Sequence, residues 1–329
     1  MKILIVRFSS IGDIVLTTPV IRALKKQLPD AEIHFLAKKT YAPVLEHNPY
    51  IDKRIYLEHD LGTIIARLKQ EQYDVVIDLQ KNLRSLRIRL ALLRSKYFSF
   101  NKLNFKKWLL VRFKIDRLPR IHIVDRYMEA VSPLGVMNDE QGLDYFISAV
   151  DEAVLGDLPE THKQGYIAWV IGARHYTKKV PEGKLVSIDL KIKQPIVLLG
   201  GKEDFIMGEK LKYSGDAVYN ACGKYELNQS VAFVKNADLV ITNDTGLMHV
   251  AAAFGKRIIS VWGNTVPQFG MYPYMRPGDP DFVALEVPDL PCRPCTKIGF
   301  DHCPKGHFRC MKRIPEVLFD ELSSQRKEA

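Results

Sequence analysis

Several features that would assign a protein to a well-defined class are missing from this chain of 329 residues. Its apolar runs all fall far short of the ~20 residues that a membrane-spanning helix needs. The first run ends at Arg7 after four apolar residues, whereas a secretory signal has about 7–15. We therefore expect a first β-strand at the amino terminus and a cytoplasmic protein.

Cysteine is scarce, and the number of cysteines is odd, five in all. A disulfide framework is therefore disfavoured. The dinucleotide-binding fingerprint G-x-G-x-x-G is absent as well, because the loop after the first strand contains a single glycine, Gly12. This absence disfavours a nicotinamide-dependent dehydrogenase.

The residues that are present describe a globular protein with an uneven charge. Hydrophobic residues make up 47% of the chain, too many for a disordered protein, and at ~150 residues per domain the length predicts about two domains. The net charge is +10, and residues 81–126 hold fourteen basic residues against two acids. Interleaved aromatic residues make an anionic partner plausible: nucleic acid, an acidic membrane surface or a phosphorylated substrate. A solvated helical face explains the stretch equally well.

Short apolar strands alternate with helices along most of the chain. This alternation predicts parallel sheets covered by helices on both faces, an α/β fold. The pattern falters at 155–164, which we take as the junction between two domains, residues 1–157 and 158–329, with a ligand site expected in the cleft between them. We predict helices at 15–27 and 314–327 and strands at 2–7, 32–36, 75–79, 166–171, 196–199, 239–241 and 258–261.

The loop after the first strand carries a carboxylate beside two hydroxyl groups. Asp13 follows Ser9, Ser10 and Gly12 at the start of the next helix. Ligands of open parallel sheets bind beyond the carboxyl ends of the strands, so Asp13 is a candidate catalytic group. Asp and Ser are also common helix caps, and position alone favours that structural role.

A second loop joins a strand to a helix rich in small residues. Asp244, Thr245 and Gly246 follow the strand, and His249 lies one turn into the helix. The free N–H groups and the dipole at such a helix start favour a phosphate, and Gly246 permits a close approach of the ligand. A capped helix with a packed histidine is the alternative.

Together these two loops resemble those of glycosyltransferase family 9, which includes the ADP-heptose:lipopolysaccharide heptosyltransferases. The resemblance extends from residue 1 to about residue 315, with the segments in the family's order. They are 9–13 with Thr18-Pro19, 78–80 with Arg84-Ser85, 172–174 with 178–181, Gly200-Gly201, and 244–246 with His249 and the alanines after it. The family has the GT-B fold, with two Rossmann-like domains facing across a cleft, the acceptor on the first and the nucleotide sugar on the second.

The resemblance implies an inverting glycosyl transfer without metal or other cofactor, in which Asp13 is the general base for the acceptor hydroxyl. The expected donor is a nucleotide sugar, ADP-heptose by likeness, and the expected acceptor is a lipopolysaccharide core. Lys178, or its neighbour Lys179, would stabilise the leaving diphosphate. The residues expected to bind the donor are Arg174, Lys178, Glu203, Asp204, Tyr225, Asp244, Thr245, Gly246 and His249.

The acceptor is expected near Ser10 and Gly12 in the first domain. Arginine favours bidentate contacts with phosphate or carboxylate, and Arg84 and Arg87 lie one helical turn apart in the basic stretch. We therefore expect these two arginines to bind the anionic glycolipid. Basic residues also attract proteins to anionic membranes, so peripheral association with the inner face of the cytoplasmic membrane is expected.

Four cysteines, Cys292, Cys295, Cys303 and Cys310, lie within nineteen residues. Their spacing, with His302 and His307 between them, suits a tetrahedral zinc site. Similar tails occur in members of the resembled family that need no zinc. Reduced thiols in a packed tail are therefore favoured, and no metal is expected.

Two other functions stay open. A nucleotide-sugar epimerase or hydrolase of the GT-B fold would need additional acids and a histidine at the sugar, a set that Asp13 and His249 alone do not make. A nucleic-acid-binding protein would use the basic residues of 81–126 but would leave the 244–246 loop unexplained. We expect a glycolipid partner and no nucleic acid.

Overall fold

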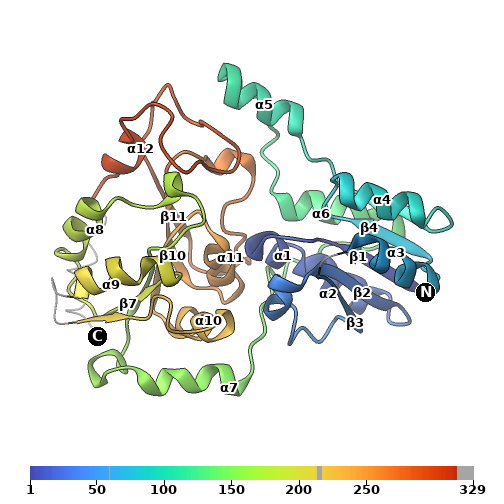
Figure 1. Cartoon of the computed structure of the whole chain (residues 1–329), viewed down its shortest axis with the longest axis horizontal. Helices are drawn as coiled ribbons and strands as arrows, with labels where there is room; N and C mark the ends of the chain where they lie inside the picture. The colour runs from blue at the N-terminus through green and yellow to red at the C-terminus, as the bar shows by residue number, and fades with distance from the viewer. Residues whose placement is uncertain (59, 213–216, 317–329) are drawn as a thin grey trace. The chain divides into compact units, whose positions relative to one another are not determined.

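The computed structural model describes residues 1–58, 60–212 and 217–316, which belong to two compact units (Figure 1). The first unit comprises Met1–Leu103, Arg120–Phe146 and Tyr274–Pro277, and the second comprises Asn104–Pro119, Ile147–Pro273 and the chain from Gly278 onward. Both units are α/β, as the sequence predicts. Each also takes a short segment from the other's part of the sequence, so that a single division after residue 157 does not describe the grouping.

The first unit contains a parallel sheet with the strand order β3-β2-β1-β4-β5. The central strand β1 is buried because helices cover both faces of the sheet. Leu4 and Val6 share a hydrophobic cluster with α3 and α4, and the alternation along a strand turns Ile3 and Ile5 to the face of α2 and α6. The bounds are β1 Lys2–Val6, α1 Ile11–Val15, α2 Thr18–Gln27, β2 Glu32–Lys38, η1 Lys39–Val44, β3 Lys53–Leu57, α3 Leu61–Gln70, β4 Val75–Asp78, α4 Leu83–Ala91, β5 Lys96–Ser99, α6 Ile123–Val131 and η2 Ser132–Leu134.

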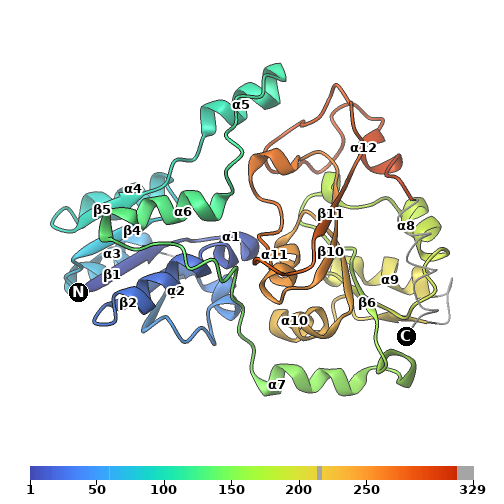
Figure 2. The ribbon, with the colours of Figure 1, turned by 180° about the vertical axis from the view of Figure 1, so that it is seen from behind.

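The second unit contains a parallel sheet (Figure 2). Its strand order is β11-β10-β9-β6-β7-β8. Helices α8, α9 and α12 contribute to the core on one face, and α10 and α11 contact each other on the other face. The bounds are α5 Asn104–Phe113, α7 Ala149–Glu152, η3 Ala153–Asp157, η4 Glu160–His162, β6 Ile167–Val170, η5 Tyr176–Lys178, α8 Glu182–Asp189, β7 Ile196–Leu199, η6 Lys202–Asp204, α9 Phe205–Lys212, β8 Val218–Asn220, α10 Leu227–Asn236, β9 Leu239–Asn243, α11 Gly246–Ala253, β10 Arg257–Trp262, η7 Pro267–Phe269, β11 Phe282–Glu286 and α12 Arg309–Lys312.

The basic segment that contains α5 packs onto the second unit. Lys114 Nζ donates a hydrogen bond to the carbonyl oxygen of Pro294 at 2.7 Å. The ammonium of Lys107 lies 5.6 Å from the ring centroid of Phe269. These contacts explain why residues 104–119 group with the second sheet although they precede it in sequence by more than forty positions.

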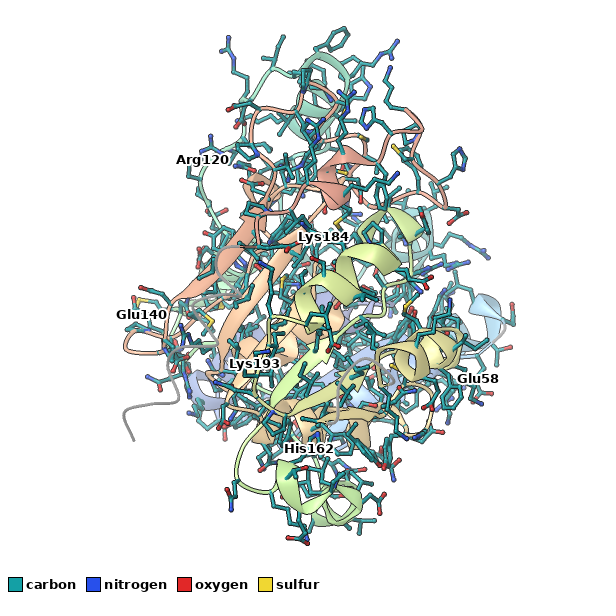
Figure 3. The ribbon with its side chains drawn as sticks, turned by 90° about the vertical axis from the view of Figure 1, so that its left-hand side faces the viewer. Glu58, Arg120, Glu140, His162, Lys184 and Lys193 are labelled. Carbon is teal, nitrogen blue, oxygen red and sulfur yellow. The ribbon has the colours of Figure 1, made fainter. Side chains whose placement is uncertain are left out.

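The described chain ends against α8. Lys184, on that helix (Figure 3), forms an ion pair with Glu316, and Ser187 Oγ donates to the same carboxylate at 2.9 Å. The last described helix, α12, ends at Lys312, and 314–316 are not helical. The rest of the helix expected at 314–327 lies outside the described residues.

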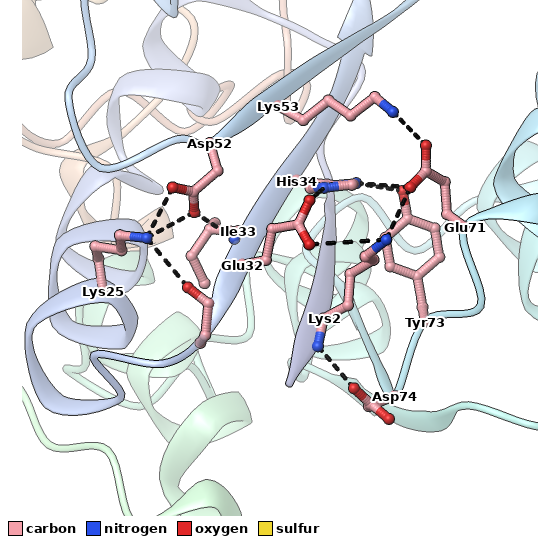
Figure 4. A network of polar contacts seen from close by, with 11 residues as sticks. Lys2, Lys25, Glu32, Ile33, His34, Asp52, Lys53, Glu71, Tyr73 and Asp74 are labelled. Atoms are coloured by element: carbon pink, nitrogen blue, oxygen red, sulfur yellow. Dashed lines mark hydrogen bonds and ion pairs between the residues drawn. The ribbon is translucent and has the colours of Figure 1, made fainter.

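A network of charged groups joins β1, β2 and β3 in the first unit (Figure 4). Glu71 pairs with Lys53, and its Oε2 lies 3.0 Å from Lys2 Nζ. His34 Nε2 lies 2.6 Å from Glu32 Oε1. Hydrogen bonding from Lys53, more than any other cause, lowers the pKa of Glu71 to about 2. The network therefore stabilises the sheet most when Glu71 is ionised.

None of the helices in the described ranges combines the length and the hydropathy of a membrane span.

Candidate functional site

Each sheet has one position at which the order of its strands reverses. This switch lies between β1 and β4 in the first unit and between β6 and β9 in the second. Loops that leave neighbouring strands there run in opposite directions, and ligands of open α/β folds bind in the resulting crevice. The two loops selected from the sequence follow β1 and β9, so each lies at a switch point.

Asp13 stands on α1, immediately after the loop that follows β1. Its Oδ2 accepts hydrogen bonds from the backbone N–H of Ser10 at 3.1 Å and from Ser10 Oγ at 2.8 Å. Its Oδ1 forms an ion pair with Arg7, and 22% of its side chain is exposed. Asp13 thus has the contacts of a helix cap, and it also presents a paired carboxylate at the switch point.

Arg7 is the residue that composition and motif reasoning missed. Its side chain is 8% exposed; it donates to the hydroxyl of Tyr127 at 3.0 Å and to the carbonyl oxygen of Leu79. Burial alone would lower the pKa of Arg7, but the nearby Asp13, Tyr127 and Asp78 outweigh this effect and raise it. A guanidinium that stays charged favours the ionised form of its partner Asp13. In the sequence, Arg7 could have been recognised as a single charged residue at the end of a buried strand.

The loop after β4 braces the first switch point. Asp78 is buried and accepts hydrogen bonds from the backbone N–H groups of Gln80 at 2.8 Å and Lys81 at 2.7 Å. Its other oxygen accepts from the Tyr97 hydroxyl at 2.7 Å. Gln80 Oε1 in turn accepts from the backbone N–H of Phe8 at 2.9 Å. These bonds hold the loops after β1 and β4 together, so the 78–80 segment has a structural task.

The predicted acceptor residues lie in two places in the first unit. Ser10 is exposed and Gly12 is buried within α1, both beside Asp13. Arg84 and Arg87 are exposed on α4, whose start is capped by Asn82 Oδ1, 3.0 Å from the backbone nitrogen of Arg84. Arg84 is in the first turn, near the switch point, and Arg87 is one turn farther along the helix.

Lys178 and Asp244 meet at the second switch point. Lys178 Nζ lies 2.6 Å from Asp244 Oδ2 and 3.0 Å from the carbonyl oxygen of Asp244. Thr265 Oγ1 donates to the same Oδ2 at 2.7 Å. The side chains of Lys178 and Asp244 are 17% and 13% exposed, so water screens this ion pair weakly. The cluster joins the loops after β6, β9 and β10.

The structure separates the two adjacent lysines. Lys179 turns toward β7, where its Nζ lies 2.6 Å from Asp204 Oδ1. The other oxygen of Asp204 accepts from the backbone N–H of Gly201 at 2.9 Å, and a side chain at Gly172 would come within 2.6 Å of it. Asp204 is therefore a buried brace of its turn, and Glu203 is the exposed acid of the pair.

Helix α11 begins within two residues of the Lys178 contact. Thr245 is its extended N-terminal cap, and Gly246 is its first residue. His249 is 3% exposed in the first turn, so it lies beneath the surface. The start of the helix therefore places backbone N–H groups beside a lysine, which is the arrangement that a phosphate requires.

The remaining predicted donor residues lie apart from this cluster. Arg174 is exposed in the loop after β6. Tyr225 follows β8 at the edge of the sheet, and its hydroxyl lies 2.6 Å from that of Tyr219 and 2.9 Å from Asp157 Oδ2. Burial, more than these hydrogen bonds, raises the pKa of Tyr225.

Two further polar residues follow β10, and the sequence reasoning passed over both. Asn264 and Thr265 are each 2% exposed. The side-chain amide of Asn264 has no hydrogen-bond partner within the described part of the chain. Both residues lie in the loop after a buried strand, as Asp13 and Asp244 do. The rule that ligand loops follow the ends of strands would therefore have found them.

The cysteine-rich tail shows protein contacts. Cys295 Sγ donates to the carbonyl oxygen of Cys292 at 3.0 Å, and Cys292 Sγ lies 3.9 Å from His307 Nε2. Burial raises the pKa of Cys295 to about 11 and that of Cys310 to about 12, so both thiols stay protonated at neutral pH. Within residues 1–58, 60–212 and 217–316, His, Cys, Asp and Glu form no group of three that could hold a metal ion.

Comparison with known proteins identifies the family of this chain. A family model described as glycosyltransferase family 9 (heptosyltransferase) matches residues 62–300. The lipooligosaccharide heptosyltransferase 2 of Haemophilus influenzae is 28% identical over 306 residues, which cover 82% of this chain and 85% of the relative.

Solved structures share the fold along nearly the whole chain. A glycosyl transferase family 9 protein from Veillonella parvula has a TM-score of 0.77 and 22% identity, covering 98% of this chain and 95% of its own. An E. coli heptosyltransferase solved with ADP-2-deoxy-2-fluoro heptose has a TM-score of 0.65 and 20% identity, covering 88% and 94%. The expected resemblance and the expected GT-B fold class are confirmed.

Proposed function

Because the chain belongs to glycosyltransferase family 9 (heptosyltransferase) and is a glycosyltransferase, we propose that it transfers heptose from ADP-heptose to a lipopolysaccharide core acceptor, with inversion at the anomeric carbon. The E. coli neighbour bound to ADP-2-deoxy-2-fluoro heptose supports the donor. The lipooligosaccharide heptosyltransferase of H. influenzae supports the acceptor class. The Lys178–Asp244–Thr265 cluster at the start of α11 is the observation that carries the proposal, because it suits a diphosphate.

Asp13 is the proposed general base. In the transfer, the acceptor hydroxyl gives its proton to the Asp13 carboxylate while its oxygen attacks the anomeric carbon. The bond between that carbon and the diphosphate oxygen breaks, and the nucleoside diphosphate leaves with the electron pair. An alcohol is a weak nucleophile, and a positioned base contributes about 10²–10⁴ in rate. Arg7 keeps Asp13 ionised before the reaction, and Ser10 fixes its direction.

The second unit is proposed to stabilise the negative charge of the leaving diphosphate. The ammonium of Lys178 has three N–H donors, and two of them are directed at Asp244. The third is available to a phosphate oxygen, as are the N–H groups of Thr245 and Gly246 at the helix start. One preorganised donor of this kind contributes about 3–4 kcal/mol to a transition state that develops negative charge.

The other proposed donor residues lie on the loops after β6, β7 and β8 and on α11. Glu203, exposed after β7, suits the ribose hydroxyls, and Arg174 is an exposed cation on the loop that carries Lys178. Asp204 and His249 support the loops from beneath the surface. Tyr225 stays the proposed contact for the nucleobase.

On the acceptor side, Ser10 and Gly12 shape the loop around Asp13, and Arg84 and Arg87 are the proposed contacts with anionic groups of the glycolipid. Guanidinium groups bind phosphate and carboxylate through paired hydrogen bonds. Arg84 stands nearer to the switch point, so its loss should raise the acceptor KM more than the loss of Arg87.

The test compares two capping aspartates of the same unit. Asp60 is the N-cap of α3 and accepts hydrogen bonds from the backbone N–H groups of Gly62 and Thr63, whereas Asp13 stands in the first turn of α1 and accepts from the backbone N–H of its N-cap, Ser10. We expect Asp13→Ala to lose about 10²–10⁴ in kcat while titration with ADP shows unchanged affinity. Asp60→Ala should cost about 1 kcal/mol of stability and leave transfer intact. If both variants retain wild-type turnover, Asp13 is a cap and the mechanism is wrong.

A further inference from the structure

Helix α4 exposes leucines where a helix on a globular protein normally exposes polar residues. Leu83, Leu86, Leu90 and Leu93 are 81%, 43%, 59% and 75% exposed. The first three belong to the helix, and Leu93 follows its C-terminal cap, Leu92. Single exposed apolar residues are ordinary, but a row of them on one element marks an interaction surface.

The spacing of these leucines places them on one face. At 3.6 residues per turn, Leu83, Leu86 and Leu90 fall within an arc of about 60°. The residues that α4 and its C-terminal cap bury are Ser85, Ile88 and Leu92, on the opposite side. The helix packs beside α3 through that buried side (Figure 1). It therefore has two apolar faces, and the unit covers one of them.

The margins of the exposed face are positively charged. Residues 81–96 contain six Lys or Arg and no Asp or Glu. Arg84, Arg87 and Arg94 are exposed around the leucines. Arg89 instead stacks on Tyr97, with its guanidinium carbon 4.4 Å from the ring centroid. A leucine face with arginines along its edges is the pattern of a helix that lies in a membrane interface.

We propose that α4 and the turn up to Lys96 form a docking surface for an anionic phospholipid bilayer, with the leucines among the acyl chains and the arginines at the headgroups. The charge selects this occupant, because two copies of a face with only positive charge repel each other. This inference deepens the proposed function, since a glycolipid acceptor lies in such a surface, but the binding can be measured without any sugar transfer.

The experiment measures sedimentation of the full chain with vesicles of phosphatidylcholine alone or mixed with phosphatidylglycerol. Binding should require the anionic lipid and should weaken as salt is added. Arg94→Gln should weaken it about fivefold, the effect of one basic residue near such a surface. Leu90→Gln with Leu93→Gln should weaken it at least about tenfold, because both side chains lose apolar burial.

A matched variant controls for the general loss of apolar surface. Leu190 and Ile206 are 58% and 72% exposed in the second unit, so Leu190→Gln with Ile206→Gln removes a similar area elsewhere. Its vesicle binding should stay within about twofold of the wild type. All four substituted side chains are exposed, so the variants should fold, which thermal unfolding checks.

Four results would overturn the proposal. One is wild-type binding by the Leu90→Gln/Leu93→Gln variant, and another is equal binding to neutral vesicles. The third is self-association through this face: the wild type would form a dimer in light scattering, and the Leu90→Gln/Leu93→Gln variant would be monomeric. Binding that appears only after acceptor glycolipid is added to the vesicles would also contradict a phospholipid surface.

The outcome stays separate from that of the proposed function. With a soluble, delipidated acceptor the Leu90→Gln/Leu93→Gln variant should keep the wild-type kcat/KM, and with a vesicle-embedded acceptor it should lose rate. Asp13→Ala should bind vesicles normally and transfer nothing. Failure of heptose transfer with intact vesicle binding therefore refutes the first proposal alone.

Discussion

The ion pair between Arg7 and Asp13 leads to a prediction about the pH dependence of transfer. Arg7→Met removes the charge and keeps much of the side-chain volume at a buried site. Without the guanidinium, the Asp13 carboxylate loses its electrostatic partner and binds a proton more readily. The proposed base is then protonated, and inactive, at a higher pH than in the wild type.

The size of this effect on the protonation of Asp13 depends on how little of the ion pair is exposed to solvent. Arg7 is 8% and Asp13 is 22% exposed, so solvent screens them less than a surface pair. An opposite charge at contact lowers a carboxyl pKa by about 1–3 units. The acid limb of the kcat/KM profile in Arg7→Met should therefore move to higher pH, and kcat/KM on that limb should fall at least about tenfold below the wild-type value.

The assay is the initial rate of transfer between about pH 4 and pH 9, at saturating donor. Arg7→Lys is the matched control, because it keeps a positive charge and should keep the acid limb near its wild-type position. Loss of one partner of a buried ion pair costs about 3–5 kcal/mol, so the melting temperature of each variant sets the temperature of the assay. A folded Arg7→Met enzyme with an unmoved acid limb would refute the assignment of Asp13 as the base that Arg7 controls.

Three further outcomes test other parts of the molecule. Lys178→Ala should weaken ADP binding about tenfold to a hundredfold in calorimetry, because it loses a charged hydrogen bond of about 1.5–3 kcal/mol. Lys179→Ala should change the affinity little, and equal effects of the two variants would show that the donor site is misassigned. The pKa of Glu71 is lowered to about 2 from 4.5, so its contribution to stability is present above pH 4.5 and fades as the pH falls toward 2. In Glu71→Gln the free energy of unfolding in urea should depend less on pH in that window, and an unchanged pH profile would contradict the network. Arg22 is 2% exposed and pairs with Asp139 at 2.7 Å, so Arg22→Met should lower the free energy of unfolding by about 3–5 kcal/mol. A decrease of less than about 1 kcal/mol in chemical unfolding would show that the pair contributes little.

Local patterns in the sequence predicted much of the fold. The central strands β1, β4, β6, β7, β9 and β10 are buried on both faces, so each reads as a short apolar run. The expected helix at 15–27 is divided in the structure, because Pro19 occupies the first turn of α2, where a missing N–H is tolerated. The loops with Asp13 and with Asp244 were found because ligand loops follow strand ends.

The edge strands were not predicted. β3 and β5 border the first sheet, and β8 and β11 border the second. An edge strand is covered on fewer sides, so it carries charged and polar residues such as Lys53, Arg54 and Lys96, and its apolar pattern is weak. Only the pairing with a buried neighbour identifies such a segment as a strand.

By itself, the sequence determined the class of fold, the family and the two loops that meet the switch points, because these depend on residue order over short distances. Tertiary structure alone decided which charges meet. It joined Lys178 to Asp244 and Lys179 to Asp204, although the two lysines are adjacent, because successive residues of that loop turn toward different strands. It also turned the leucines of α4 outward, since the core of the unit takes one face of each helix and leaves the other to solvent or to a partner.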